Sequence, residues 1–217
     1  MKKLLVGGFL ALIFTPGWAQ YDPKAYEILE AMSKKYKAIP AFEATITYAL
    51  TNETEKISEE IKGKITVKGD KYRLALKEQE VYNNGTTVWT YLPEDKEVNV
   101  EDFDAAADDS FNPSKIFEMY KKGYKYLYLT DRTENGVLCE EIDLVPEKKD
   151  AKYFKIKMLI SKKDKSVQSF TFFEKAGNRY RYTITKFNPN PKIDDTYFTF
   201  DVKKHPDVSV NELRDKH

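Results

Sequence analysis

Apolar and polar residues alternate along much of this chain, and the alternation is clearest between residues 63 and 91. Successive side chains of a β-strand point to opposite faces, so a period of two predicts strands that are apolar on one face. Gly-containing turns at residues 68–70 and 83–85 separate these strands. The large apolar residues that share a face within each strand are Ile65 and Val67, Tyr72 and Leu74, and Trp89 and Tyr91. The pattern predicts a twisted antiparallel sheet with one apolar face.

The same period continues on both sides of this region. In residues 153–161, for example, Phe154, Ile156 and Met158 alternate with lysines. The strands that we expect cover residues 42–50, 57–67, 71–76, 80–82, 87–91, 97–100, 124–130, 137–144, 153–161, 167–174 and 180–187. The chain then closes with residues 197–202 and a polar tail for which no structure is predicted.

Two segments break the alternation with helical spacing. The first runs from Pro23 to about Lys37, where Pro23 suits a first helical position and several large apolar residues fall on one side. The second is a short helix that begins at Pro113. Its apolar side is expected to carry Ile116, Phe117, Met119 and Tyr120.

About eleven strands against two or three short helices place the chain in the mainly β class with short helices, α+β in the broad sense. A sheet of that size curls to protect its edges, and helices in the breaks then plug or cover its concave apolar side. The chain also has 15 Tyr and 13 Phe, which supply large apolar area, and each Tyr keeps a polar tip for a wet boundary. These aromatic residues either fill a core or leave an apolar hollow, and the pattern leaves both readings open.

The first nineteen residues have the features of a secretory signal peptide. Basic residues precede an apolar run of roughly a dozen residues, and small residues follow it up to Ala19. Pro16 stops the run well short of the about 20 apolar residues that a membrane anchor needs. We therefore expect residues 1–19 to be removed and residues 20–217 to form a single exported domain.

Charge and cysteine content narrow the partners and the compartment. Residues 20–217 contain 34 basic and 35 acidic residues, and this near-neutral balance argues against a nucleic-acid partner. The single cysteine, Cys139, rules out an internal disulfide bond. Export without disulfides fits a bacterial periplasm better than an animal extracellular space.

Residues for catalysis or metal binding are scarce. The two histidines, His205 and His217, lie near the C-terminus, so a histidine-based nucleophile or a zinc site lacks partners. Cys139 follows apolar residues in a predicted strand, which favours a core position. The acidic run 101–109 lacks the spacing of a calcium loop and is interpreted as solvated, while a hydrolase with paired carboxylates stays open as an alternative. We expect a protein that is not an enzyme and that holds no cofactor or metal.

One segment is more specific than the others. Residues 84–93 read Asn-Gly-Thr-Thr-Val-Trp-Thr-Tyr-Leu-Pro, and Val98-Asn99-Val100, the helix led by Pro113 and Phe198-Thr199-Phe200 follow in order. In this order of features, nearly the whole exported chain resembles the periplasmic outer-membrane lipoprotein carrier family, LolA. The resemblance implies a single unclosed antiparallel β-barrel with helices as a lid or plug over an apolar cavity.

The resemblance also implies a function. Members of this family take the acyl chains of a lipoprotein from an inner-membrane lipoprotein-releasing transporter and pass them to an outer-membrane acceptor, with no bond made or broken. We therefore expect a monomeric periplasmic carrier of acylated lipoprotein or another lipid. The expected lipid-binding residues are Ile65, Val67, Tyr72, Leu74, Trp89, Tyr91, Ile116, Phe117, Met119, Tyr120, Phe154, Ile156 and Met158.

Lys68 stands where well-known members of the family place an arginine that closes the lid. By the resemblance Lys68 is expected to control lid closure, although it lacks the planar fork of arginine. Two alternatives on the same half-barrel stay open. One is a regulatory or sensor module that binds a protein partner, and the other is a carrier of a different lipid or a glycolipid, because a fold does not settle function.

Overall fold

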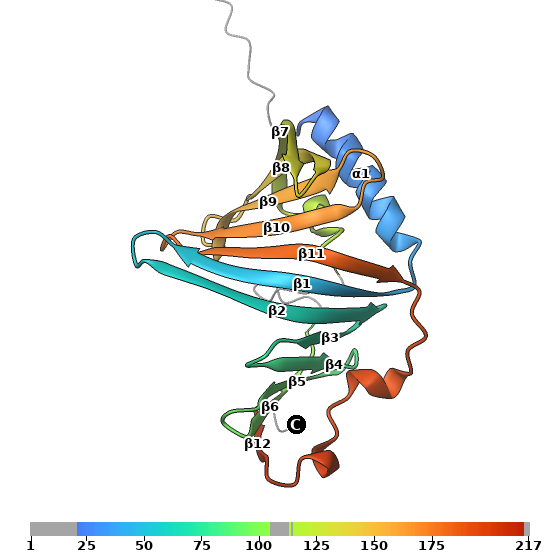
Figure 1. Ribbon diagram of the computed structural model, residues 1–217, viewed down its shortest axis with the longest axis vertical. Helices are drawn as coiled ribbons and strands as arrows, with labels where there is room; N and C mark the ends of the chain where they lie inside the picture. Colours follow the sequence, from blue (N-terminus) through green and yellow to red (C-terminus); the bar gives the residue numbers. More distant parts are fainter. Residues whose placement is uncertain (1–20, 105–112, 114, 215–217) are drawn as a thin grey trace, which may run out of the picture.

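The computed structural model describes residues 21–104, 113 and 115–214, and one large sheet dominates them (Figure 1). The predicted signal peptide over residues 1–19 lies outside the described residues. Twelve strands join within the described part in the order β12-β6-β5-β4-β3-β2-β1-β11-β10-β9-β8-β7. The strands are β1 (Ala41–Asn52), β2 (Ile57–Lys68), β3 (Lys71–Ala75), β4 (Glu80–Asn83), β5 (Thr87–Leu92), β6 (Glu97–Asp102), β7 (Tyr124–Glu134), β8 (Val137–Pro146), β9 (Tyr153–Ser161), β10 (Val167–Glu174), β11 (Arg179–Pro189) and β12 (Ser209–Glu212).

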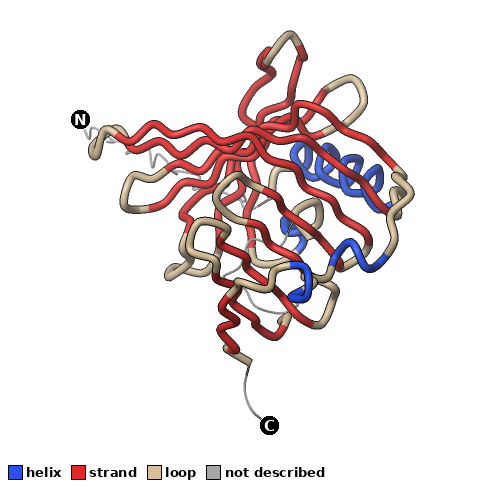
Figure 2. Tube along the Cα trace, turned by 60° about the horizontal axis from the view of Figure 1, so that its bottom comes forward, coloured by secondary structure: helices blue, strands red, loops and turns tan. Residues whose placement is uncertain are grey.

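Two antiparallel series of strands meet at β1, which pairs with β2 on one side and with β11 on the other. The strands β12 and β7 form the two ends of the sheet and do not pair with each other. The sheet is strongly twisted and curves around the helices without closing (Figure 2). The predicted mainly β fold with an unclosed barrel is therefore confirmed. The additional strand is β12, which the polar tail forms by pairing in parallel with β6.

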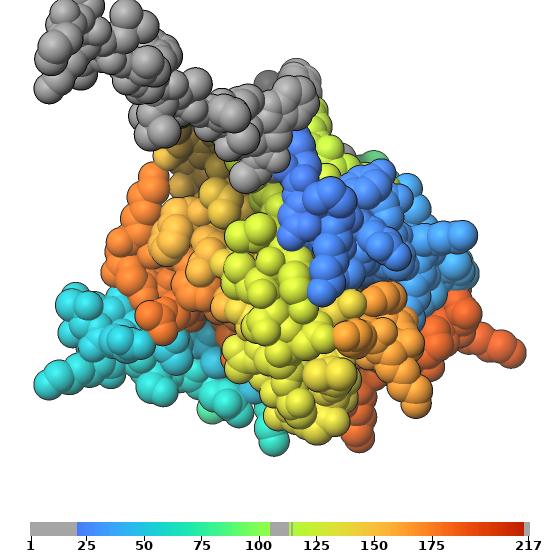
Figure 3. Space-filling model, turned by 90° about the horizontal axis from the view of Figure 1, so that it is seen from above, coloured from blue at the N-terminus to red at the C-terminus, as the bar shows by residue number. Residues whose placement is uncertain are grey.

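The helix α1 (Pro23–Lys37) covers one end of the sheet, beside β7 to β11 (Figure 1). The carboxylate of Asp22 caps it by accepting hydrogen bonds from the backbone N–H groups of Lys24 and Ala25, at 2.9 and 3.4 Å. The buried residues of the helix are Ala25, Ile28, Leu29, Met32, Ser33 and Tyr36. Seen from above, α1 lies directly against β7 (Figure 3). The predicted N-terminal helix is confirmed.

The predicted helix that begins at Pro113 is wrong in its type. Pro113 and residues 115–118 form turns, and only Met119–Lys121 form a helix, the 3₁₀ helix η1. The backbone N–H of Glu118 bonds to the carbonyl of Lys115, which is the tighter pattern of a 3₁₀ turn. So short a segment gains little from an α-helical nucleus, and the packing of its apolar side chains sets its path instead. We call Pro113 and residues 115–121 the lid segment.

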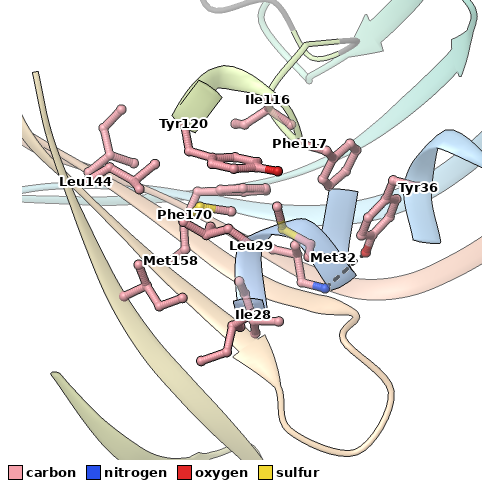
Figure 4. Close-up of a cluster of buried hydrophobic side chains, with 14 of the residues drawn as sticks. Ile28, Leu29, Met32, Tyr36, Ile116, Phe117, Tyr120, Leu144, Met158 and Phe170 are labelled. Carbon is pink, nitrogen blue, oxygen red and sulfur yellow. Dashed lines mark hydrogen bonds between the residues drawn. The ribbon is translucent and has the colours of Figure 1, made fainter. Parts of the chain in front are cut away.

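The buried apolar residues of the described part form two clusters on opposite faces of the sheet. The main cluster lies on the concave face between the sheet, α1 and the lid segment (Figure 4). Tyr72 and Leu74 of β3 pack against it. The intervening Arg73 faces the other way and pairs with Tyr82, a member of the second cluster. Thus β3 separates two environments.

The C-terminal segment covers the outer face near the second cluster. After β11 the chain runs past β1 to β6 and forms two short 3₁₀ helices, η2 (Asp195–Phe198) and η3 (Val202–Lys204), before it reaches β12 (Figure 1). The ring of Phe200 lies 5.6 Å from that of Tyr82 and 5.1 Å from that of Tyr91. The outer face of this half of the sheet is therefore apolar too, and the chain covers it with its own end.

Candidate functional site

A small apolar cavity of about 40 Å³ lies on the concave face. It is bounded by the sheet and by the lid segment. Its lining residues are Phe42, Ala44, Ile46, Ile65, Leu74, Pro113, Ile116, Phe117, Phe170, Tyr182 and Ile184. A space of this size holds about one water molecule, far less than an acyl chain.

The side chains of the lid segment fill most of the hollow. Ile116, Phe117 and Tyr120 are 6%, 6% and 2% exposed, so all three point into the molecule (Figure 4). The ring of Phe117 stacks on that of Tyr36 of α1 with the ring centroids 3.6 Å apart and the planes inclined by 3°. Phe117 also meets the ring of Phe42 at 5.9 Å. The concave wall is thus apolar and is occupied by a short segment that is not part of the sheet.

Polar contacts between the lid segment and α1 surround this apolar plug. The hydroxyl of Tyr120 donates a hydrogen bond of 2.5 Å to Glu30, and Lys37 forms an ion pair of 2.7 Å with Glu118. Lys121 lies 3.6 Å from the Glu30 carboxylate and 3.4 Å from the Glu118 carboxylate. The hydrogen bond from Tyr120 lowers the pKa of Glu30, and that from Lys37 lowers the pKa of Glu118. These charged groups are 37–56% exposed, so each pair contributes little on its own.

Two larger recesses adjoin this cavity. A groove of about 410 Å³ shares Leu74, Pro113 and Tyr182 with it. A smaller recess of about 240 Å³, between α1 and the start of β1, shares Phe42 and Phe117 with it. The lid segment therefore separates spaces that would join if its side chains left the hollow.

Most of the residues expected to bind lipid come together on the concave face. They belong to the main cluster or pack against it: Ile65, Val67, Tyr72, Leu74, Ile116, Phe117, Met119, Tyr120, Ile156 and Met158. Ile156 and Met158 are fully buried in the main cluster and are not among the residues that line the cavity. The concave face is thus the place where the sequence-based candidates converge.

Three of the expected residues lie elsewhere. Trp89 and Tyr91 pack in the second cluster, on the outer face beneath the C-terminal segment. Phe154 is 46% exposed and contacts Phe173 on the outside of the sheet. A bulge beside Phe173 shifts the register there, so Tyr153 turns inward and Phe154 outward.

Lys68 binds the C-terminal segment. Its ammonium donates to the carbonyl of Ile193 at 3.1 Å and to the carboxylate of Asp195 at 2.7 Å. Asp195 also accepts from Lys71 at 2.6 Å. Hydrogen bonds from the two lysines lower the pKa of Asp195 to about 2. Lys68 thus anchors the end of β2 to the outer segment, on the face opposite the cavity.

Several residues of the cavity were missed in the sequence. Tyr36, Phe42, Phe170, Tyr182 and Ile184 line it or pack against its lid, and each lies in a segment whose period was recognised. The period shows that such residues share a face. Only the strand order shows that β2, β1, β11 and β10 follow one another in the sheet. The missing signal was therefore the pairing of distant strands.

Metal binding and nucleophilic chemistry depend on how the candidate groups lie in the described part of the chain. No three His, Cys, Asp or Glu residues there are placed to hold a metal ion. Cys139 is fully buried, and burial raises the pKa of its thiol, which disfavours the nucleophilic thiolate. None of the helices described is both long and apolar enough to cross a membrane. What the site offers is apolar surface under a small lid.

Solved structures share this architecture at low sequence identity. An uncharacterized conserved protein from Thermus thermophilus is 12% identical, with 88% of this chain and 99% of that chain covered and a TM-score of 0.58. A LolA superfamily protein from Nitrosomonas europaea is 11% identical, with 82% and 98% covered and a TM-score of 0.45. The Mycobacterium tuberculosis lipoprotein LppX is 10% identical, with 80% and 100% covered and a TM-score of 0.49. The likeness to the Thermus thermophilus protein shows the fold alone.

No curated protein matches the sequence. The family model of the outer membrane lipoprotein carrier protein LolA, however, matches residues 39–201, from just before β1 to just before η3. This match covers far more than half of the chain and includes the cavity wall and the lid segment. The chain therefore belongs to the LolA family.

Proposed function

We propose that this protein shields the acyl chains of lipoproteins in its concave cavity and carries them from the inner to the outer membrane. One observation carries the proposal: side chains of a short non-sheet segment, with Phe117 foremost, fill an apolar hollow that the sheet itself leaves open. Membership of the LolA family supports the same function. In this function the lid residues stand in for cargo while the carrier is empty.

The energetics favour such an exchange. Each CH₂ group moved from water to an apolar site gains about 0.8 kcal/mol, so a long acyl chain has ample driving force to enter the hollow. Entry must first displace Phe117 and its neighbours, whose buried contacts with Tyr36 and Phe42 are then lost. The net free energy of binding is the gain from burying the acyl chain minus the loss of these contacts. A carrier that must also release its cargo needs that moderate net affinity.

The setting and the partners follow from the same proposal. Removal of residues 1–19 would leave a single exported domain, residues 20–217, that works as a monomer in the periplasm. An inner-membrane transporter would deliver the acyl chains and an outer-membrane acceptor would take them. No bond is made or broken in this cycle, in keeping with a family whose members are carriers and binding proteins.

Replacement of Leu74 by Asp tests the cavity directly. Leu74 lines both the cavity and the groove, so a carboxylate there would place an unpaired charge where the hydrocarbon must lie. We expect the variant to lose binding of the uncharged fluorophore N-phenyl-1-naphthylamine and of an acylated lipoprotein. Circular dichroism should show that the sheet is retained.

The matched control is Phe154→Asp, which adds the same charge on the outer face of β9 where Phe154 is 46% exposed. This control should bind both ligands as the parent protein does. If the parent binds neither ligand, or if the folded Leu74→Asp variant binds both normally, the proposed carrier function is wrong. Co-purification with a membrane-bound regulator in place of lipid would instead favour a sensor role.

A further inference from the structure

The groove of about 410 Å³ adjoins the apolar cavity and shares Leu74, Pro113 and Tyr182 with it. The rest of its lining mixes apolar, aromatic and acidic residues. The groove lining consists of Tyr48, Glu59, Ile61, Tyr72, Leu74, Leu76, Glu78, Gln79, Val81, Pro113 and Tyr182. A lipid whose tail lies in the cavity would place its head group here.

The charged groups of this groove, among the described residues, are both carboxylates. Glu59 lies on the concave face of β2, two residues from Ile61, and Glu78 lies in the turn between β3 and β4. Neither carboxylate forms an ion pair within the described part of the chain. On β8, by contrast, Asp143 is paired with Lys155 at 3.2 Å and Glu141 with Arg132 at 3.2 Å. The groove thus presents negative charge without a built-in counter-charge.

Tyrosines supply the remaining polar groups. The rings of Tyr48 and Tyr182 lie 5.2 Å apart at the edge of the main cluster, and Tyr72 packs against the cluster from β3. Burial, with the neighbouring tyrosines and Glu59, raises the pKa of Tyr48 to about 12. Its hydroxyl therefore keeps its proton at neutral pH and can donate a hydrogen bond, while the ring offers a flat apolar surface.

These groups match one kind of head group better than another. An ionised carboxylate only accepts hydrogen bonds, so Glu59 and Glu78 require donors from the ligand. Alcohol groups of a sugar or a glycerol donate to carboxylates, accept from tyrosine hydroxyls and can lie against aromatic rings. A carboxylate or a fully ionised phosphate can only accept, and both are repelled by the two glutamates.

We infer that the cavity and groove together select lipids with an uncharged, hydroxyl-bearing head group over lipids of the same chain length with an anionic one. The inference rests on the proposed lipid-carrying function and specifies which amphiphiles the site takes. Glu59 and Glu78 are the residues that determine this selectivity, and the apolar wall contributes equally to both classes of lipid.

The test is displacement of N-phenyl-1-naphthylamine by two amphiphiles with the same twelve-carbon chain, dodecyl maltoside and dodecyl phosphate, each below its micelle concentration. At low salt we expect dodecyl phosphate to compete at least about threefold more weakly, a size that two partly solvated charges can produce. The variant Glu59→Gln/Glu78→Gln should improve dodecyl phosphate selectively and reduce the difference. Glu60→Gln removes one such charge from the next residue of β2, on the opposite face, and should leave the difference unchanged.

The outcomes separate this inference from the carrier function. If the fluorophore does not bind at all, the proposed function fails and the inference fails with it. If the fluorophore binds but dodecyl phosphate competes as well as or better than dodecyl maltoside, only the head-group inference is overturned. The same holds if Glu60→Gln changes the ratio as much as the double variant does.

Discussion

Replacement of Phe117 by Ala should make the empty carrier bind lipid more tightly. Phe117 is 6% exposed and stacks on Tyr36 with the ring centroids 3.6 Å apart, so its burial holds the lid segment in the hollow. Burial of a phenylalanine side chain stabilises by about 1.5–3 kcal/mol. A ligand that occupies the same space must overcome this contribution before it binds, and Ala removes most of it.

The upper value of about 3 kcal/mol corresponds to a factor of about 150 in a binding constant, which sets the upper limit of the gain. We expect titration with N-phenyl-1-naphthylamine to show an affinity at least about threefold above that of the parent, together with a lower melting temperature. The control Phe173→Ala removes a ring that contacts Phe154 on the outer face of β10. That variant should lose stability without gaining affinity. Equal or weaker binding by a folded Phe117→Ala variant would refute the idea that the lid competes with cargo.

Three further predictions concern stability. A Cβ at Gly63 would lie 2.4 Å from the Leu76 side chain. Gly63→Ala should therefore lower the free energy of unfolding, measured in urea, by about 1–3 kcal/mol. An unchanged free energy of unfolding would contradict the close packing. The pKa of Asp195 is lowered to about 2 in the folded protein, so its contribution to folding stability is present above about pH 4 and is lost as the pH falls toward 2. Asp195→Asn should therefore make the free energy of unfolding depend less steeply on pH in this acid range. An equally steep dependence in the variant would exclude a stabilising role of the Asp195 carboxylate. The Tyr36 hydroxyl accepts a hydrogen bond from the buried N–H of Val167 at 3.0 Å. Tyr36→Phe should therefore lower the free energy of unfolding, measured by chemical denaturation, by about 1–3 kcal/mol. An unchanged value would show that the N–H finds another acceptor.

The local pattern of the sequence predicted most of the strands because a period of two is a property of each strand alone. The period of two correctly predicted that Ile65 and Val67 share one face of their strand, and that Trp89 and Tyr91 share one face of theirs. It could not say which face each pair would occupy, because that depends on what covers the sheet. The outer face near β5 is covered by the C-terminal segment, so Trp89 and Tyr91 pack beneath Phe200 and away from the cavity.

Other departures have equally local causes. The bulge between β9 and β10 inverts the direction of Phe154, and no residue in the sequence marks it. The polar tail forms β12 because the backbone of β6 offers a free edge, which the side-chain pattern of the tail does not reveal. Lys68 reaches Asp195, a residue more than a hundred positions later, so its partner depends on the path of the C-terminal segment.

Photo-crosslinking to cargo tests most directly whether hydrocarbon lies against the concave wall. The photoreactive amino acid p-benzoyl-phenylalanine would replace Tyr182, which lines both the cavity and the groove, or Phe154, which is exposed on the outer face. Cells that also make acylated lipoproteins would then be irradiated, and crosslinked lipoprotein would be detected by its mass. We expect a crosslinked product from position 182 and none from position 154. Crosslinking from position 154 but not from position 182 would contradict carriage in the cavity.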